Sequence, residues 1–405
     1  MTMNSRGISA LVGCIVIFVL FSGFVFSQTN TQADEDFYVA KGMYTDQLYE
    51  LAATQFQEFL QDYPNSTHAA EAQFLLAESY FQLEEYSRAV DAYTALLTQY
   101  PAVDYRDRAQ YRIGEALVHL EKYERAQQAF TRFFNRYPDS DLYPNAAYWN
   151  GEALYQAGDY EESLDMYQRV YRDYPESNLA DYAFYSAAFA QEQLGRWTQA
   201  IDSYTTLTEE YPQSELVEQA MYRAGFAAYS DNDNSQTIRL LQQARKQYPT
   251  SPFVAQANYL IGESYYNKGN YDDAIAAYQK VTADQGGAYT DDAEYGLGWA
   301  HYQIQSYAEA ANAFQQTARM TSDSTLAASA LFQAGRNYQL NGNLNDARNA
   351  YQKVFSEYPK STDAPNGLLE YASLTYQRGN YSSAKEHYMR IVTDYPQADV
   401  TPEAH

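Results

Sequence analysis

Cysteine is almost absent from this sequence. Of 405 residues only Cys14 is a cysteine, and it lies in an apolar segment at the N-terminus. The remainder of the chain can form no disulfide framework and offers no thiolate. Basic residues are also scarce, because 27 lysines and arginines stand against 52 aspartates and glutamates and leave a net charge of -25. Such a surface repels phosphate backbones, so we expect no nucleic-acid partner.

The sequence also lacks the signatures of common enzymes. It has no phosphate-binding glycine loop, no paired metal-ligand histidines and no nucleophile elbow. The histidines are scattered without ligand spacing, at His68, His119, His301, His387 and His405. We expect no enzymatic activity, no cofactor and no metal. The hydrophobic fraction of 46% is too high for a disordered chain. The acidic residues form either a solvated outer face or a surface suited to a basic partner or a salty habitat.

Residues 1–27 have the pattern of a secretory signal peptide. Arg6 supplies the positive start, residues 8–26 form a nearly unbroken apolar run, and Ser27 offers a cleavage site before Gln28. A short linker, 28–33, follows.

Two other outcomes for this segment remain open. Leu11-Val12-Gly13-Cys14 matches a bacterial lipobox, in which Cys14 would be lipidated. The apolar run is also long enough to stay uncleaved as a membrane anchor. All three outcomes place the rest of the chain outside the cytoplasm, with membrane contact only through this segment.

Beyond residue 33 the sequence repeats itself. Tyr-Pro pairs recur every 37 residues at Tyr63, Tyr100, Tyr137, Tyr174, Tyr211 and Tyr248, and return at Tyr358 and Tyr395. The frame skips two sites, near Gln285 and Ser322, in a stretch that is one residue short. A fixed period of this length indicates stacked supersecondary units.

Each period predicts two helices. In residues 66–83, apolar side chains recur at three- and four-residue spacing, which is one face of a helix. Glycines suited to a left-handed turn follow, at Gly158, Gly195, Gly269, Gly342 and Gly379. A second helix is expected to begin at Tyr86, Tyr123, Tyr160, Trp197, Tyr271, Tyr307, Leu344 and Tyr381 and to end at the Tyr-Pro pair. We expect the next first helix to be capped by Ser66, Ser140, Ser177, Ser214, Ser251 and Ser361, with Pro252 at a first helical position.

The pattern resembles the tetratricopeptide (TPR) signature of a small residue in the first helix and Ala-x-x-x-aromatic in the second. The small residues are Ala77, Gly114, Gly151, Ala188, Gly225, Gly262, Gly298, Gly335 and Ala372. The aromatic partners include Tyr93, Phe130, Tyr204, Tyr278, Phe314 and Tyr351, with Tyr167 and Leu241 as variants. The resemblance implies an all-α, right-handed TPR superhelix (α-solenoid) of about ten helix-turn-helix repeats over 34–396, with 397–405 starting a further, truncated repeat.

The 37-residue repeats also look like the envelope TPRs of Gram-negative bacteria. They are similar to the periplasmic coordinator that works with the Tol–Pal system and to BamD-like proteins of outer-membrane assembly. The resemblance implies an exported protein, periplasmic or associated with the outer membrane, that acts as a scaffold. It does not imply a specific partner.

Two rows of aromatic residues lie on the predicted first helices of the repeats. The first row lies three residues before each small residue, at Phe37, Phe74, Tyr111, Tyr148, Tyr185, Tyr222, Tyr259, Tyr295 and Phe332. The second row lies four residues after it, at Phe81, Tyr155, Tyr229, Tyr266, Tyr302 and Tyr376. The rows share a helix face, and in the TPR fold the first row faces the concave groove. Glu78, Glu115, Glu152 and Glu263 border the rows and would favour cationic groups.

The aromatic rows lead to a hypothesis of function. Tyrosine combines a large rigid contact area with a hydroxyl that can stay hydrated, which suits the recognition of peptides. We expect a non-catalytic scaffold of the bacterial cell envelope that binds protein or peptide partners, basic ones included, in envelope assembly or cell-division coordination. The alternative is a glycan-binding or peptidoglycan-binding protein, since tyrosines also stack on sugars. The rows could equally stiffen the superhelix.

Overall fold

The computed structural model describes residues 31–283 and 287–404. The predicted signal peptide and residues 28–30 of the predicted linker lie outside these residues. A helix runs over residues 31–45, so it takes in 31–33, the end of that linker. Within the described residues there is no strand. No helix among them is both long and apolar enough to cross a membrane.

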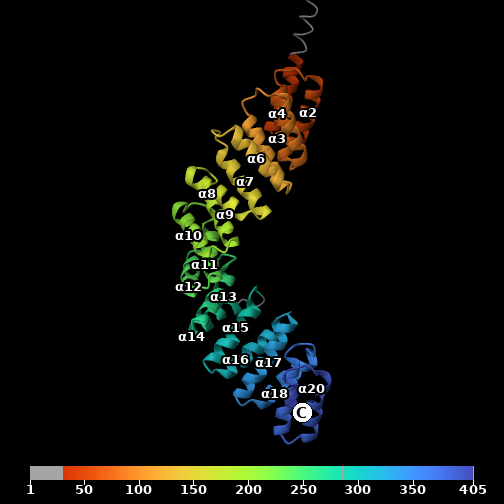
Figure 1. The fold of residues 1–405 in the computed structure, drawn as a ribbon, viewed down its shortest axis with the longest axis vertical. Helices are drawn as coiled ribbons and strands as arrows, with labels where there is room; N and C mark the ends of the chain where they lie inside the picture. Colours follow the sequence, from red (N-terminus) through yellow and green to blue (C-terminus); the bar gives the residue numbers. More distant parts are fainter. Residues whose placement is uncertain (1–30, 284–286, 405) are drawn as a thin grey trace, which may run out of the picture. The chain divides into compact units, whose positions relative to one another are not determined.

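The chain divides into two compact units, one ending at Leu194 and the other beginning at Gly195. In the first unit the helix over 31–45 is followed by α2 (Tyr49–Asp62), α3 (Ala69–Gln82), α4 (Tyr86–Gln99), α5 (Arg106–His119), α6 (Tyr123–Arg136), α7 (Tyr143–Ala157), α8 (Tyr160–Asp173) and α9 (Ala180–Gln193). From α2 to α9, each helix packs on the next along the chain (Figure 1). The helix over 31–45 and the odd-numbered helices are called the first helices below, and the even-numbered ones the second helices.

The second unit continues the same order. Its helices are α10 (Trp197–Glu210), α11 (Val217–Ser230), α12 (Asn234–Gln247), α13 (Val254–Asn267), α14 (Tyr271–Thr282), α15 (Thr290–Gln303), α16 (Tyr307–Met320), α17 (Ser324–Leu340), α18 (Leu344–Glu357), α19 (Ala364–Gln377), α20 (Tyr381–Asp394) and the short 3-10 helix η1 (Thr401–Ala404). Neighbouring first helices also touch, as α11 touches α13 and α13 touches α15. Each unit is therefore an α-solenoid of the TPR type, as the sequence predicts.

The second helices begin where the sequence predicts. Their first residues are the expected aromatic or leucine at α4, α6, α8, α10, α14, α16, α18 and α20. Where the Tyr-Pro pair is present they end just before it, as α4 ends at Gln99. The predicted glycines also adopt left-handed backbone angles; Gly158, for example, has φ of 90° at the end of α7.

The predicted serine caps are wrong. The hydroxyl of Ser66 accepts a hydrogen bond of 3.2 Å from the backbone N–H of His68, and α3 begins only at Ala69. Equivalent bonds occur at Ser140, Ser177, Ser214 and Ser251. Likewise α13 begins two residues after Pro252, and α19 begins three residues after Ser361. Where this bond is present, at Ser66, Ser140, Ser177, Ser214 and Ser251, the chain makes one more turn after the proline, and the serine closes that turn instead of capping the helix.

The two skipped Tyr-Pro sites change the local structure. Near the first, α14 ends early, at Thr282. Near the second, α17 extends to 17 residues and begins with a side-chain cap, because Asp323 accepts hydrogen bonds from Thr325 and Leu326. Without the proline, an acidic N-cap starts the helix directly.

The core of each repeat is a contact between its two helices. A Cβ added to Gly151 would lie 2.6 Å from Cε1 of Tyr167, and one added to Gly114 would lie 2.5 Å from Cε1 of Phe130. Gly262, Gly298 and Gly335 meet their second-helix aromatics in the same way. The small residue therefore lets a buried ring of the second helix lie against the first helix of the same repeat.

Candidate functional site

The first aromatic row lies along the first helices and is largely covered. Phe37, Phe74, Tyr111 and Tyr222 are buried, whereas Tyr148, Tyr185, Tyr259, Tyr295 and Phe332 are half-buried. Most rings pack on the aromatic of the second helix in the same repeat. The ring centroids are 5.9 Å apart for Phe74 and Tyr93, 5.8 Å for Tyr148 and Tyr167, and 5.4 Å for Tyr295 and Phe314. One face of each of these first-row rings therefore packs against the core of its repeat.

The second row is more accessible. Phe81, Tyr155, Tyr229, Tyr266 and Tyr302 are half-buried, and Tyr376 is 56% exposed. Most of these rings meet the aromatic that begins the next helix, edge to face, at 5.3 Å for Tyr155 and Tyr160 and 5.4 Å for Tyr266 and Tyr271. Phe81 and Tyr376 make the same kind of pair, and Tyr302 meets Tyr307 in a tilted one. Each pair sets a ring at the turn between two helices with part of its surface open to solvent.

The bordering glutamates are hydrogen-bonded within their repeats. Tyr167 donates to Oε1 of Glu152 at 2.7 Å, and Tyr278 donates to Oε1 of Glu263 at 2.5 Å. Tyr93 donates to Glu78 in the same way. Burial, and then the charge of Glu152, raises the pKa of Tyr167 well above its usual value. These phenols therefore stay protonated and act as donors.

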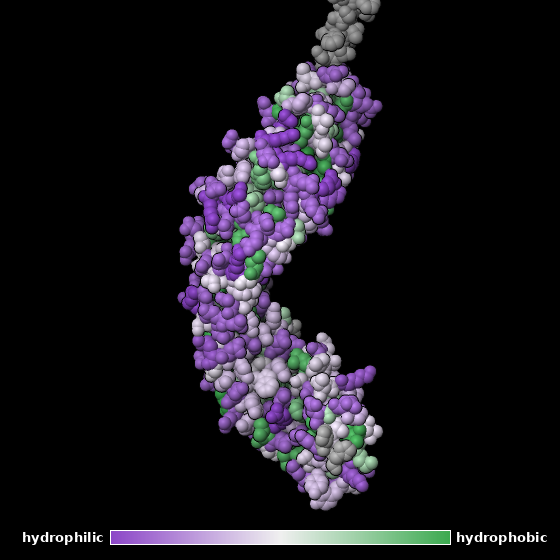
Figure 2. Space-filling view, viewed as in Figure 1, coloured by the Kyte–Doolittle hydropathy of each residue, from purple (hydrophilic) through white to green (hydrophobic). Residues whose placement is uncertain are grey.

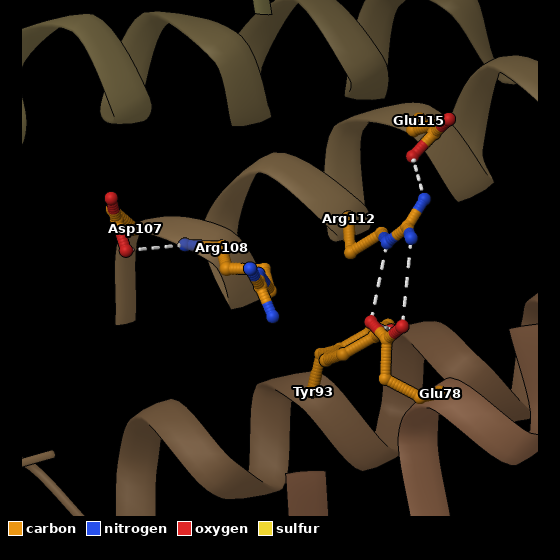
Figure 3. Close-up of polar contacts among 6 residues, drawn as sticks. All are labelled: Glu78, Tyr93, Asp107, Arg108, Arg112 and Glu115. Atoms are coloured by element: carbon orange, nitrogen blue, oxygen red, sulfur yellow. Dashed lines mark hydrogen bonds and ion pairs between the residues drawn. The ribbon is translucent and has the colours of Figure 1, made fainter. Parts of the chain in front are cut away.

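In the first unit the carboxylates hold a buried cation (Figure 3). Arg112 on α5 donates from Nε to Oε1 of Glu78 at 3.2 Å and from Nη1 to Oε2 of Glu115 at 2.7 Å. Its guanidinium carbon lies 4.5 Å from the centre of the Phe81 ring. Burial alone would lower the pKa of Arg112, but the charges of Glu78 and Glu115 outweigh it and raise that pKa. The network joins two repeats, because Glu78 belongs to α3.

Arg112 lies two residues before the small residue Gly114. In the other repeats that carry a tyrosine–glutamate pair, a different residue occupies this position. Facing Glu152 it is Ser186, which donates to Oε1 of that glutamate at 3.1 Å. Facing Glu263 it is Gly296, which has no side chain to offer. An open pocket of about 440 Å³ lies there, lined by Tyr259, Glu263, Tyr266, Asn267, Tyr278, Asp292, Tyr295, Gly296 and Trp299.

The structure thus brings only some of the predicted site residues together. Tyr259, Tyr266 and Tyr295 share this pocket, whereas Phe74, Tyr111 and Tyr222 are buried in the cores of their own repeats. The roles of Arg112, Tyr167 and Tyr278 were not predicted. A signal for the tyrosines exists in the sequence, because tyrosine follows glutamate by 15 residues at 78/93, 152/167 and 263/278. Among the described residues, no group of His, Cys, Asp or Glu side chains could hold a metal ion.

Family models agree with this geometry. Models of the tetratricopeptide repeat match residues 44–104 and 111–178, and others match 255–284 and 329–361. These matches identify tetratricopeptide repeats in the chain. A further model, that of the YfiO outer membrane lipoproteins, matches residues 183–269 of this TPR chain. No protein with a curated description matches the sequence.

Solved structures resemble the chain in fold. The C-terminal part of a TPR repeat-containing protein from Cytophaga hutchinsonii is 17% identical, with a TM-score of 0.50, over 63% of this chain and 97% of that one. A tetratricopeptide repeat protein from Parabacteroides merdae is 14% identical, with a TM-score of 0.42, over 65% of this chain and 98% of that one. MamA from Desulfovibrio magneticus is 17% identical, with a TM-score of 0.40, over 45% and 97%. The first of these likenesses supports the TPR fold.

Proposed function

We propose that this protein is a non-catalytic scaffold of the bacterial cell envelope that holds polypeptide partners on its first helices. The observation that carries the proposal is the second aromatic row. Its rings recur once in most repeats and stay partly open to solvent. Partly open aromatic rings at regular intervals suit an extended partner, since each ring offers contact area at little cost in side-chain entropy.

The compartment is part of the proposal. The match to an outer membrane lipoprotein family over residues 183–269 supports an envelope location, as does the apolar pattern of residues 1–27. This match favours the BamD-like resemblance over the Tol–Pal coordinator.

The chemistry of the partner follows from charge. The surface seen in Figure 2 is largely hydrophilic, with apolar residues scattered over it, and the chain carries a net charge of -25. A polypeptide with basic and apolar side chains would meet complementary charge and aromatic contacts here. The first-row rings would contribute mainly through packing, by stabilising the helices that carry the second row.

The test is site-specific photocrosslinking in cells. A photoreactive phenylalanine is placed at Tyr155, Tyr229 or Tyr302 of the second row, and at Asp91 or Asp202 on exposed faces of second helices as controls. We expect discrete adducts with protein partners at the three tyrosine positions, in the envelope fraction, and none at the controls.

Other outcomes would contradict the proposal. Adducts that survive proteases but disappear with a peptidoglycan hydrolase would assign the surface to glycan strands. Equal adducts at test and control positions, or none at either, would show that the second row is not a partner-binding surface. Adducts confined to the cytoplasmic fraction would refute the envelope location.

A further inference from the structure

The pocket beside Gly296 lies at the repeat position that Arg112 fills in the first unit. Counted from the small residues Gly114 and Gly298, Arg112 and Gly296 stand at the same place, two residues earlier. A Cβ at Gly296 would lie 2.7 Å from Cζ of Tyr278, so the close approach of this ring excludes a side chain there. The space next to Glu263 is consequently open.

The surroundings of the two positions correspond residue by residue. Glu263 takes the place of Glu78, and Tyr278 that of Tyr93, with the same hydrogen bond from hydroxyl to carboxylate. Tyr266 takes the place of Phe81, whose ring carries the Arg112 guanidinium. Trp299 replaces Glu115 and Tyr295 replaces Tyr111. The pocket therefore keeps one of the two carboxylates and the aromatic faces of the Arg112 site but lacks the arginine.

The aromatic walls are held by contacts around them. The ring of Tyr266 packs edge to face on Tyr271, and its hydroxyl accepts a 3.1 Å hydrogen bond from Gln303. Trp299 packs on Phe314 at 5.4 Å and lies nearly perpendicular to Tyr295. A cation that enters meets rings already in position, which lowers the cost of ordering them.

Among the residues that the structure describes, no cationic side chain lines this negatively charged pocket. The ammonium of Lys268 donates to Ser235. The only hydrogen bond to Glu263 from a described residue comes from Tyr278. Burial raises the pKa of Glu263, the Tyr278 hydroxyl opposes this, and the charge of Asp292 raises it further. A bound cation would relieve both the burial cost and the repulsion.

We propose that this pocket binds the guanidinium group of an arginine side chain from a partner polypeptide, with Glu263 as its counter-ion and Tyr266 and Trp299 as its aromatic walls. A guanidinium stacks on aromatic faces and pairs with a carboxylate at once, as Arg112 does inside the protein. This inference rests on the proposed function, because it identifies the chemistry of one contact of the scaffold.

The test uses short peptides and the folded chain. A labelled, capped peptide Gly-Ser-Arg-Ser-Gly is titrated by fluorescence anisotropy against the same peptide with citrulline, which is neutral and nearly isosteric. Loss of the charge should weaken binding roughly tenfold, as expected for a cation between a carboxylate and aromatic rings. With 5-fluorotryptophan in the protein, the ¹⁹F signal of Trp299, assigned by its absence in Trp299→Phe, should shift on binding, whereas those of Trp149 and Trp197 should not.

The variants distinguish the effect of the carboxylate in the pocket from the effect of the protein's overall negative charge. Glu263→Gln keeps an acceptor for Tyr278 and should weaken arginine binding roughly tenfold. Glu294→Gln makes the same change of charge on α15 at a residue outside the pocket lining and should leave binding unchanged. If Glu263→Gln does not fold, Tyr266→Leu removes one aromatic wall and should weaken arginine binding in the same direction.

Three results would overturn the inference: equal affinity for arginine and citrulline, equal effects of Glu263→Gln and Glu294→Gln, or no binding at millimolar peptide. Crosslinks at Tyr155 are made in the first unit, so the scaffold function stands or fails independently of these results.

Discussion

Arg112 on α5 reaches across a repeat boundary and donates a hydrogen bond of 3.2 Å to Glu78 on α3. The side chains of Arg112 and Glu78 are 23% and 8% exposed, so this ion pair is partly removed from water. Glu115, which is also buried, shares the guanidinium.

Replacing this arginine should be costly. Arg112→Met leaves Glu78 and Glu115 buried near each other without their cation, and should destabilise the first unit by about 3–5 kcal/mol. Arg169→Met is a matched control, since its ion pair with Asp165 is solvent-exposed and should contribute at most about 1 kcal/mol. Urea unfolding followed by Trp149 fluorescence, in a Trp197→Phe, Trp299→Phe background, reports on this unit. Similar midpoints for the two variants would contradict the prediction.

A methyl group at Gly151 should destabilise the protein. It would lie 2.6 Å from a carbon of the buried Tyr167 ring, and overpacking of this kind costs about 1–3 kcal/mol. In Gly42→Ala the new methyl meets no atom within 4 Å, and Gly42 lies in the helix over 31–45. This second variant should gain about 0.5–1 kcal/mol from helix propensity. Thermal denaturation by circular dichroism should shift in opposite directions for the two variants.

Glycine should stabilise two turns. Glu84 and Glu121 have positive φ angles, 60° and 57°, at the turn where other repeats carry glycine. Glu84→Gly and Glu121→Gly should each gain about 1 kcal/mol, because the Cβ strain of a left-handed residue is removed. Gly158→Ala, at a φ of 90°, should lose stability instead. A fall in the urea midpoint of Glu84→Gly would refute this account of the turn.

The two aromatic rows should differ in how much their side chains contribute to the stability of the protein. Phe74 is 7% exposed and packs on Tyr93 and Tyr105, so Phe74→Ala should cost about 3–5 kcal/mol. Tyr376 is 56% exposed, and Tyr376→Ala should change the free energy of unfolding by less than about 1 kcal/mol. Equal losses in urea titrations would mean that the second row also belongs to the core.

The stability of Glu263→Gln should depend on pH. Since burial raises the pKa of Glu263 in the folded state, its ionised form opposes folding, and stability is lost as pH rises through that raised pKa. The variant should therefore have a higher melting temperature than the wild type at pH 7. The difference should shrink toward the pKa of an unfolded glutamate, about 4.3. A lower melting temperature at pH 7 would contradict the burial argument.

Much of the fold follows from the sequence because local signals repeat. The aromatic at Tyr86 and the proline after Tyr100 bracket α4, and the same pair of signals brackets most second helices. The Ser66 cap was predicted from local propensity, but a turn before α3 takes up its hydroxyl. The site is less predictable, since Arg112 acts through a residue 34 positions away in another repeat.

The glycine–ring contacts bear on how such an array can be rearranged. Gly114 and Phe130 belong to one repeat, as do Gly225 and Leu241, so a transplanted repeat would bring its own matched packing. A transplanted repeat that carries Arg112 would lose an ion pair, because the counter-ion Glu78 belongs to the preceding repeat. Whole repeats are therefore interchangeable modules in their cores, whereas Arg112 gives its repeat a preferred neighbour and so encodes part of the order of the array.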